Sequence, residues 1–423
     1  MRKRSRESVL ILAGTVAALL PGGGAFGQQE DQPIDPTAQT VLERARPDHD
    51  PIGLRAGGFL FFPLVELGAQ FNSNVFNTNG ERKADLIWIV SPGLRLNSTW
   101  SNHMLNIFAR GDFGFYTAQP RENFLDFAAG IESRVDIQRD TRLLFDASAT
   151  RAHEERGSPE DANGRFPSVY YLHKGDARFR HRLNRLSVEL GSLVEYYDFN
   201  DVEGAFGRTI DQDDRDRLRW EGAVRLGYYF QPRVEVFVRG AFNVVRYARS
   251  PDRNGFERDS SGFGILGGLN FRLTSTLFGE LGVGYREQHY DDTRLSPARG
   301  PGFSGRLTWL VTPLTTVQVS GARTIEESIL SNTSSYFMTT GQIDVAHELL
   351  RNLILQGRFT VQNLDYNGIS RSDTYFRPGI GVTYLMGRHV HLRAKYDIVY
   401  RKSNINGQDY ETHLVWLGVR FQY

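Results

Sequence analysis

The chain has 423 residues, with 50 basic and 49 acidic side chains, 40% hydrophobic residues, 43 glycines and no cysteine. Without cysteine it has no disulfide framework, no thiolate nucleophile and no cysteine-ligated metal. The formal net charge of +1 argues against an electrostatic nucleic-acid binder, whose binding domain would be strongly basic. A mean hydropathy of −0.40 excludes a bundle of membrane-spanning helices.

The first 27 residues have the composition of a secretory signal peptide. Four basic side chains lie within the first six residues, residues 9–20 are apolar, and residues 21–27 are mostly small. The apolar run is shorter than the roughly 20 residues that a membrane-spanning helix needs. We therefore expect residues 1–27 to be removed during export.

Residues 28–52 have the composition of a linker. Five polar residues open the segment, and four prolines with scattered charges follow, so little apolar surface is available for burial. We expect this segment to be flexible, and we place the folded domain in residues 53–423.

From residue 53 to the last residue the dominant pattern has a period of two. In residues 124–138 one set of alternate positions is apolar except for Ser133, and the other set is mostly charged. Residues 233–247 and 389–401 show the same alternation. Such a strand has one face against an apolar medium and the other in water. These stretches also exceed the roughly five or six residues that are usual for a soluble strand.

Short and long connections alternate along the chain. Eight short polar joints are expected at residues 98–102, 138–141, 182–185, 231–233, 273–276, 312–315, 350–352 and 387–389. Nine longer connections rich in Gly, Asn and Asp are expected at residues 72–85, 117–123, 154–167, 200–213, 249–257, 291–299, 328–334, 367–372 and 403–408. Short turns on one rim and long loops on the other are typical of an outer-membrane barrel.

These patterns predict an all-β fold: a transmembrane antiparallel β-barrel of about 18 strands, with about 16 as the alternative count. In lipid every backbone amide needs a partner within the protein, so a β-structure spans the membrane only as a closed cylinder. An even strand count places both termini in the periplasm, together with the short turns. The competing interpretation is a soluble secreted β-sandwich or solenoid, whose strands would be shorter and whose connections would not alternate in length.

The end of the chain carries a further signal. Phe421 and Tyr423 continue an alternation that begins at Val415, and the chain ends on an aromatic residue. This ending resembles the C-terminal insertion signal of bacterial outer-membrane proteins, which implies the barrel-assembly machinery as a partner. We therefore expect a location in the outer membrane of a Gram-negative bacterium, with lipid and lipopolysaccharide around the barrel.

Several segments resemble one family of proteobacterial outer-membrane proteins. The opening of that family is similar to RARPDHDPIGL at residues 44–54, GFLFFP at 58–63 and QFNSNVF at 70–76. Further likeness lies in SPGLR at 91–95, ERGSP at 155–159, DRDR at 214–217 and HELLRN at 347–352. The chain thus resembles the putative β-barrel porin 2 family over nearly the whole mature sequence. The resemblance implies a barrel and an outer-membrane address, and it brings no catalytic residues and no settled solute.

Motifs for other chemistry are incomplete in this chain. Residues 262–267 match GxGxxG, but a dinucleotide site needs a helix after the strand, and no helical pattern follows. The four aspartates of residues 211–216 could offer oxygen ligands to calcium, yet the loop lacks EF-hand spacing, so solvated loop charges are the preferred interpretation. His389 and His391 lack a third ligand for zinc. No GxSxG motif supports a hydrolase at the loop that follows His153. We therefore expect no cofactor, no metal and no enzymatic activity.

The polar face of the strands, which is expected to point into the lumen, contains the candidate pore-lining residues. By parity, the candidate pore-lining residues are Arg110, Asp112, Asp126, Glu132, Arg134, Asp136, Arg142, Asp146, Glu235, Arg239, Arg358, Arg393, Lys395, Asp397 and Arg401. Both signs occur, often two residues apart, so Arg134 and Asp136 are expected to neutralise one another along the wall. Charged rings set selectivity in pores, and barrels of roughly 16 to 18 strands normally enclose an aqueous channel. The alternative is that these residues only solvate or plug the lumen.

We therefore expect a pore for the passive passage of hydrophilic solutes, with saccharides as the candidate class and no nucleic-acid partner. The first alternative is an outer-membrane component of surface-polysaccharide export or assembly, in which residues 28–52 dock a partner. The second is a structural or adhesive barrel with a closed lumen. Energy-coupled import is disfavoured, because the chain is too short for a plug domain and a barrel of about 22 strands.

Overall fold

The computed structural model describes residues 39–204, 207–330 and 332–423. The predicted signal peptide and the first part of the predicted linker, residues 28–38, lie outside the described residues. Within the described ranges, no helix is long and apolar enough to cross a membrane.

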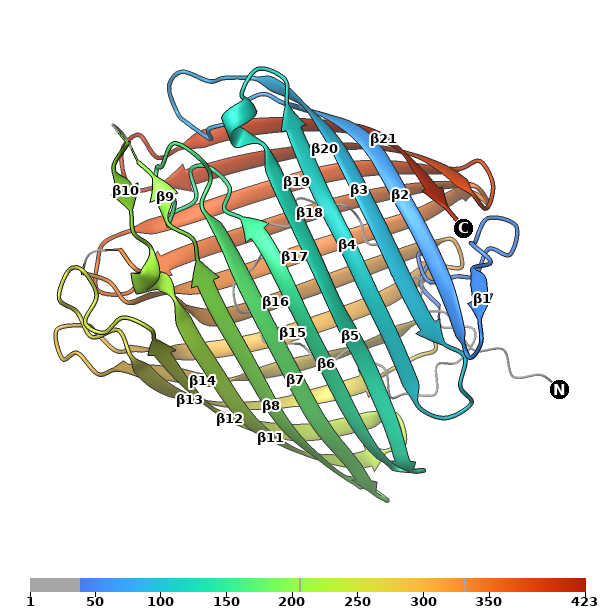
Figure 1. Ribbon diagram of the computed structural model, residues 1–423. Coiled ribbons are helices and arrows are strands. Elements are labelled where there is room, and N and C mark those ends of the chain that lie inside the picture. The colour runs from blue at the N-terminus through green and yellow to red at the C-terminus, as the bar shows by residue number, and fades with distance from the viewer. Residues whose placement is uncertain (1–38, 205–206, 331) are drawn as a thin grey trace.

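The described residues form one closed antiparallel barrel of 18 long strands, in which neighbours in sequence are neighbours in the sheet (Figure 1). The strands are β2 (Phe59–Asn72), β3 (Asp85–Ser98), β4 (Met104–Tyr116), β5 (Phe124–Gln138), β6 (Thr141–His153), β7 (Val169–Leu183), β8 (Leu186–Phe199), β11 (Arg217–Gln231), β12 (Val234–Tyr247), β13 (Ser260–Arg272), β14 (Leu277–Tyr290), β15 (Ala298–Thr312), β16 (Thr315–Glu327), β17 (Ser335–Leu350), β18 (Leu353–Tyr366), β19 (Ser372–Leu385), β20 (Val390–Ser403) and β21 (Tyr410–Gln422). The barrel closes between β2 and β21, where Leu64 lies opposite Gln422 and Asn72 lies opposite Leu414. The predicted fold and strand count are confirmed.

The two rims of the barrel differ in the length of their connections, as predicted. All of the predicted short joints connect consecutive strands at one end, which we call the short-turn rim, and all of the predicted long connections lie at the other end, the long-loop rim. The long loops carry η1 (Pro120–Glu122), η3 (Asp213–Arg215) and a small hairpin of β9 (Val202–Glu203) and β10 (Thr209–Ile210). A short β1 (Leu54–Ala56) pairs with the start of β2, and both lie at the short-turn rim with the C-terminus (Figure 1).

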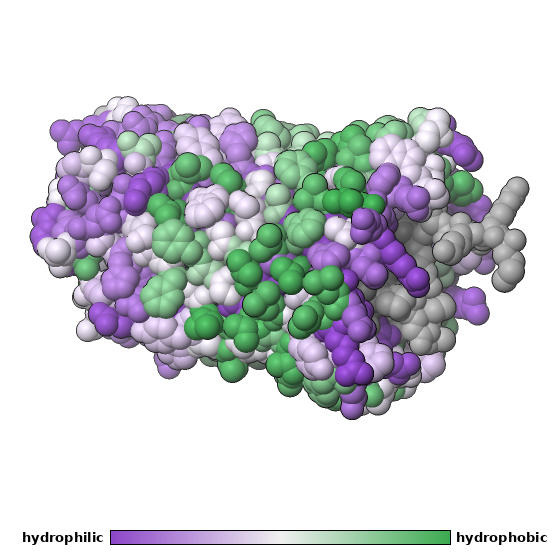
Figure 2. All heavy atoms as spheres, turned by 90° about the horizontal axis from the view of Figure 1, so that it is seen from below, coloured by the Kyte–Doolittle hydropathy of each residue, from purple (hydrophilic) through white to green (hydrophobic). Residues whose placement is uncertain are grey.

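Alternate positions of each strand meet different surroundings. On the outer wall Val283 is 70% exposed, Leu417 58% and Trp88 55%, although all three side chains are apolar. Facing the lumen, Glu235 is 4% exposed and Glu66 is 5% exposed. On the face shown in Figure 2, apolar side chains gather over the middle of the barrel and hydrophilic ones lie toward its ends. This reversal of the usual distribution is what a hydrocarbon environment around a polar lumen requires.

A charge on the outer wall should therefore be costly. Replacing Val283 by arginine is expected to destabilise the barrel by about 2–4 kcal/mol, because the residue lies near the middle of β14 on the exposed apolar face. Urea unfolding of the protein in lipid vesicles measures the effect. The matched control is Gln356→Arg, which places the same charge at a residue that lines the lumen and should change the free energy of unfolding by less than about 1 kcal/mol. Equal effects of the two variants would contradict the assignment of faces.

The barrel wall divides near the long-loop rim, between β15 and β16. These strands pair from Thr312 and Thr315 up to Phe303 and Arg323, but residues 298–302 of β15 pair only with β14. Above this point Glu327 and Ile329 line the lumen cavity. The end of β16 and the first residues of the loop that follows it, which we call loop 328–334, therefore face the lumen.

Candidate functional site

The lumen contains a cavity of about 650 Å³. Its lining begins with Leu42 and Arg46 near the short-turn rim and reaches Glu154, Glu160 and Ile329 near the long-loop rim. Charged, hydrogen-bonding and aromatic side chains share this wall. The cavity is therefore the candidate functional site, since it follows the direction that a solute would take through the barrel.

Part of the predicted pore-lining set borders the cavity directly. These residues are Arg110, Asp112, Asp126 and Arg393. The Ser91 hydroxyl donates a hydrogen bond to Asp112 over 2.7 Å. His153 Nδ1 lies 2.8 Å from a carboxylate oxygen of Asp126. Both carboxylates are thus held in place by neighbours on the inner wall.

Most of the other predicted residues form ion pairs along the inner wall. Asp136 lies 3.3 Å from Arg134 and 3.2 Å from Arg142, so the predicted pairing of Arg134 with Asp136 is present. The remaining pairs are Asp146–Arg178, Glu235–Arg225, Arg239–Glu221, Arg358–Asp344 and Arg401–Asp373. These residues stiffen the wall and balance its charge, and a role for them in selecting solutes stays a prediction.

Three further predicted residues also face the lumen. Asn106 Nδ2 donates to Glu132 over 3.4 Å. The Lys395 ammonium lies 5.1 Å from the centre of the Trp416 ring. Asp397 lies two positions after Lys395 on β20, so the two side chains are on the same face of the strand. These positions agree with the face that the alternation predicts, and a role of the three residues in lining the pore stays a prediction.

Aromatic rings support several inward arginines, a feature that parity did not reveal. The guanidinium carbon of Arg217 lies 4.3 Å from the centre of the Tyr197 ring, and Arg225 lies 3.7 Å from that of Phe237. Arg217 and Tyr197 are direct cross-strand partners in β11 and β8. Finding this support from sequence needs the register between strands, which hydrophobic periodicity alone does not supply.

Glu66 is a buried inward carboxylate that was absent from the predicted pore-lining set. It is 5% exposed, and its carboxylate accepts hydrogen bonds from Arg393 Nη1 at 2.7 and 2.8 Å and from Arg420 Nε at 2.7 Å. All three residues line the cavity. The alternation in β2 could have identified Glu66, because it lies between the apolar outward positions Val65 and Leu67.

Removing this negative charge should change the ion preference of the lumen. In a Glu66→Gln variant, Arg393 and Arg420 lose their shared carboxylate, so anions should become favoured over cations by roughly twofold relative to the unaltered protein. Reversal potentials in a salt gradient across a planar bilayer measure this ratio. The Arg358 partner Asp344 does not line the cavity, so Asp344→Asn serves as the control with a much smaller shift. A shift toward cations in Glu66→Gln would refute the argument.

A long loop crosses into the barrel at the long-loop rim. This inner loop, residues 154–168, is held at Gly157, whose carbonyl accepts from Arg401 over 2.9 Å. Farther along, Glu160 accepts from the Ser328 hydroxyl over 2.7 Å and from the Ile329 N–H over 3.2 Å. The inner loop therefore connects to loop 328–334 and narrows the lumen.

The described part of the segment expected to be flexible lies inside the barrel. Residues 39–51, which we call the strap, pack against the inner wall at the short-turn rim, where Val41 is 1% exposed. The strap side chains Leu42, Arg44 and Arg46 line the cavity. The sequence predicted a flexible linker here. The structure differs because the residues that the strap contacts lie on β16 to β20, far from the strap in the sequence.

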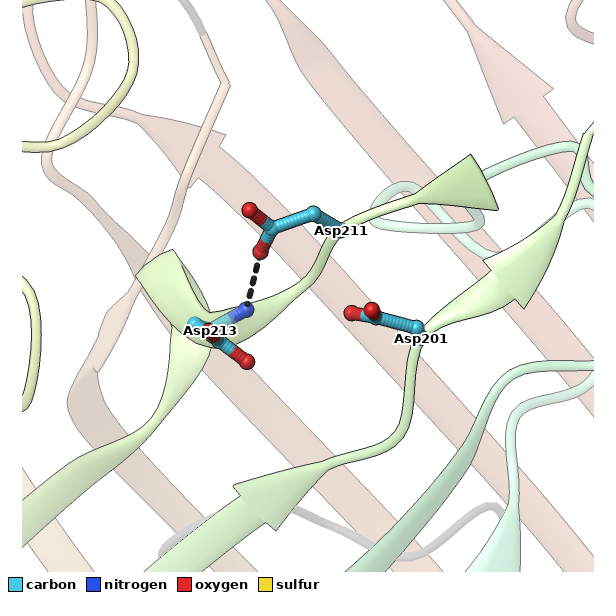
Figure 3. A group of neighbouring side chains, drawn as sticks. All are labelled: Asp201, Asp211 and Asp213. Carbon is cyan, nitrogen blue, oxygen red and sulfur yellow. Dashed lines mark hydrogen bonds between the residues drawn. The ribbon is translucent and has the colours of Figure 1, made fainter. Parts of the chain in front are cut away.

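An acidic cluster on the long-loop rim corresponds to the loop considered above for calcium. Asp201, Asp211 and Asp213 bring carboxylate oxygens within 4.8 Å of one another (Figure 3). The backbone N–H of Asp213 donates to Asp211 over 3.0 Å, and Arg249 pairs with Asp211 at 2.8 Å. The Asp213 hydrogen bond is the main cause that lowers the pKa of Asp211, and Arg249 adds to it. Arg249 thus offsets part of the negative charge of this cluster.

The chain matches one protein family and is similar to several solved structures. The family described as putative beta-barrel porin 2 matches residues 46–423. No curated protein matches the chain. Among solved structures, OpdL and OpdK of Pseudomonas aeruginosa are similar at 12% identity each, with TM-scores of 0.41 and 0.44. The likeness covers 87% of this chain and 99% of OpdL, and 86% of this chain and 99% of OpdK. OccAB3 of Acinetobacter baumannii is similar at 11% identity with a TM-score of 0.43, over 87% of this chain and 100% of that chain.

The family match includes every strand of the barrel, from β2 to the last residue. The closed 18-strand sheet and its apolar outer wall agree with that match. The chain therefore belongs to the putative beta-barrel porin 2 family and is a porin-like barrel of the outer membrane.

Proposed function

We propose that the protein is a pore for the passive passage of hydrophilic solutes, oriented with the short-turn rim and both termini in the periplasm. The observation that carries this proposal is the lumen cavity, lined by charged side chains within a wall whose outer face is apolar. Water-filled barrels of this size conduct when side chains leave part of the lumen open. Short turns on the periplasmic side are the arrangement of outer-membrane barrels, which supports the orientation.

Saccharides are the solute class that we propose for this pore. Near the inner loop, the cavity wall contains Glu154, Glu155 and Glu160 together with Arg156, Arg215 and Arg217, so the two signs are balanced. Hydroxyl groups both donate and accept hydrogen bonds. A neutral, hydroxyl-rich solute can therefore bond to groups of both signs without meeting a net electrostatic barrier.

Conductance and solute uptake of the purified full-length protein test this function. In planar bilayers we expect steady open conductance. In proteoliposomes we expect swelling in isosmotic solutions of small neutral sugars, at rates that fall as the sugar becomes larger. Conductance without sugar-driven swelling would contradict the saccharide assignment, and silence in both assays would contradict the pore.

A closed barrel is the second candidate function, since specific contacts favour it. The inner loop and loop 328–334 are joined through Glu160, and the strap occupies part of the opposite end of the lumen. A structural or adhesive barrel would be silent in bilayers. A component of surface-polysaccharide export would also be silent without its partners, and its deletion would remove a surface glycan, which separates these two alternatives.

A further inference from the structure

The strap is anchored to the inner wall by a buried apolar contact. Val41 packs against Ala346, Ile354 and Leu385, which lie on β17, β18 and β19. Its backbone N–H donates to the Thr316 hydroxyl over 2.9 Å. We call the site formed by Thr316, Ala346, Ile354 and Leu385 the socket. The socket shields the Val41 side chain from water and accepts a hydrogen bond from its backbone N–H, so packing and hydrogen bonding both fix the position of the strap.

A buried ion pair forms the second anchor. Arg46 Nη2 lies 2.9 Å from Glu348, and their side chains are 9% and 7% exposed. The same Arg46 nitrogen donates to the Val41 carbonyl over 2.8 Å, so the two anchors are coupled. Arg44 lies 3.5 Å from the Glu348 carboxylate and also donates to the Pro313 carbonyl. One carboxylate on β17 thus holds two arginines of the strap.

A third set of contacts holds the later part of the strap through its backbone. Arg388 Nε donates to the Pro47 carbonyl over 3.0 Å. His391 Nε2 lies 3.3 Å from the His49 carbonyl. The strap is therefore bound as a peptide ligand is bound, with one buried apolar side chain, one buried arginine and several backbone contacts.

We propose that the inner wall at the short-turn rim is a peptide-binding socket, that residues 39–51 are its ligand in cis, and that the occupied socket narrows the passage. The ligand class is a peptide that folds into two turns and carries a small aliphatic residue five positions before an arginine. The linkage to β1 keeps the strap at high effective concentration at the socket. The narrowing rests on the proposed pore function, whereas the binding of the peptide does not.

Peptide binding to the full-length protein tests the socket directly. The double substitution Val41→Asp and Arg46→Ser removes both anchors from the strap while leaving every barrel strand unchanged. A fluorescein-labelled peptide of residues 39–52 should bind this variant saturably in detergent, as measured by fluorescence anisotropy. The unaltered protein should bind the peptide much more weakly, because its socket is occupied. Equal binding to both proteins, or no binding to either, would overturn the socket.

Substitutions in the socket give the matched comparison. Adding Glu348→Gln to the double variant should weaken peptide binding at least about tenfold, because the peptide arginine would lose its buried carboxylate. Adding Asp344→Asn should leave affinity unchanged, since this carboxylate lies on the same strand but pairs with Arg358. Equal loss from both additions would show general damage to β17 and refute the specific contact.

Bilayer recordings test the narrowing separately. The double variant should conduct more than the unaltered protein, by roughly half or more, and added unlabelled peptide should lower its conductance again. Equal conductance of the two proteins would overturn the narrowing while leaving the pore intact. Silence of both would refute the proposed pore function, and the anisotropy measurements would still decide whether the socket exists.

Discussion

Replacing Arg258 by methionine should destabilise the protein by about 3–5 kcal/mol, because it breaks a buried ion pair by removing one partner. Arg258 is 2% exposed, and its Nε lies 2.7 Å from Asp252. Its Nη1 also donates to the carbonyls of Ser328 and Thr333 over 2.6 and 2.8 Å. The variant removes the cation that pairs with buried Asp252 and the donor to both carbonyls, whereas the backbone N–H groups of Asn254 and Phe256 still donate to Asp252. Urea unfolding in detergent micelles measures the loss.

The control for this prediction is an arginine with looser contacts. Arg246 has a side chain that is 50% exposed and lies 3.7 Å from Asp259 and 3.8 Å from Asp291. Replacing Arg246 by methionine should cost less than about 1 kcal/mol. If both variants lose the same stability, burial of the Arg258 pair is not the cause.

The same pair also predicts a dependence on pH. Burial raises the pKa of Asp252, but hydrogen bonds from the Phe256 N–H and from Arg258 outweigh it and hold this pKa below the ordinary value of 3.8. A carboxyl whose pKa is lowered by folding stabilises the folded state above the unfolded pKa, and the contribution disappears as the pH falls through the folded pKa. The Arg258→Met variant should therefore lose less stability than the unaltered protein when the pH falls below about 4.

Removing the contacts of the inner loop should give the largest change in conductance. Residues 156–161 carry the Glu160 link to loop 328–334 and the ion pair of Arg156 with Glu122, and several of them line the cavity. Replacing these six residues by a glycine-serine sequence of equal length should raise single-channel conductance at least about twofold, because the loop can then leave the lumen. Planar-bilayer recordings measure the change.

A replacement of the same kind in another long loop provides the control. Residues 404–408 are exposed and lie outside the cavity lining, so a glycine-serine sequence there should leave conductance unchanged. An increase in both variants would mean that any loose loop alters the recording. No increase in the inner-loop variant would mean that residues 156–161 do not narrow the passage.

The sequence predicted the wall of the barrel closely. Period-two alternation, as in residues 124–138, is a local property, because each residue's face is set by its position in an extended chain. The length of each connection is local too, and it revealed the two rims. For the same reason, the inward direction of Arg134, Asp136 and Lys395 could be predicted without knowing their partners.

Contacts across the lumen needed the tertiary structure. The local sequence around Arg46 gives no sign of Glu348, and that around Glu160 gives no sign of Ser328, because the pairs are joined only when the sheet has closed. The strap has the composition of a linker, since its prolines and charges leave it little apolar surface of its own. The burial of one valine is nevertheless enough to anchor it once β17 to β19 form a socket around that side chain.

The sequence by itself thus determined that this protein is a closed β-barrel with an apolar outside, a charged inside and two unlike rims. Only the tertiary structure decided how much of the inside is occupied, and by which segments. The physical reason is that the faces of a strand follow from repeating geometry, whereas the filling of the lumen depends on shape and charge matching between residues hundreds of positions apart.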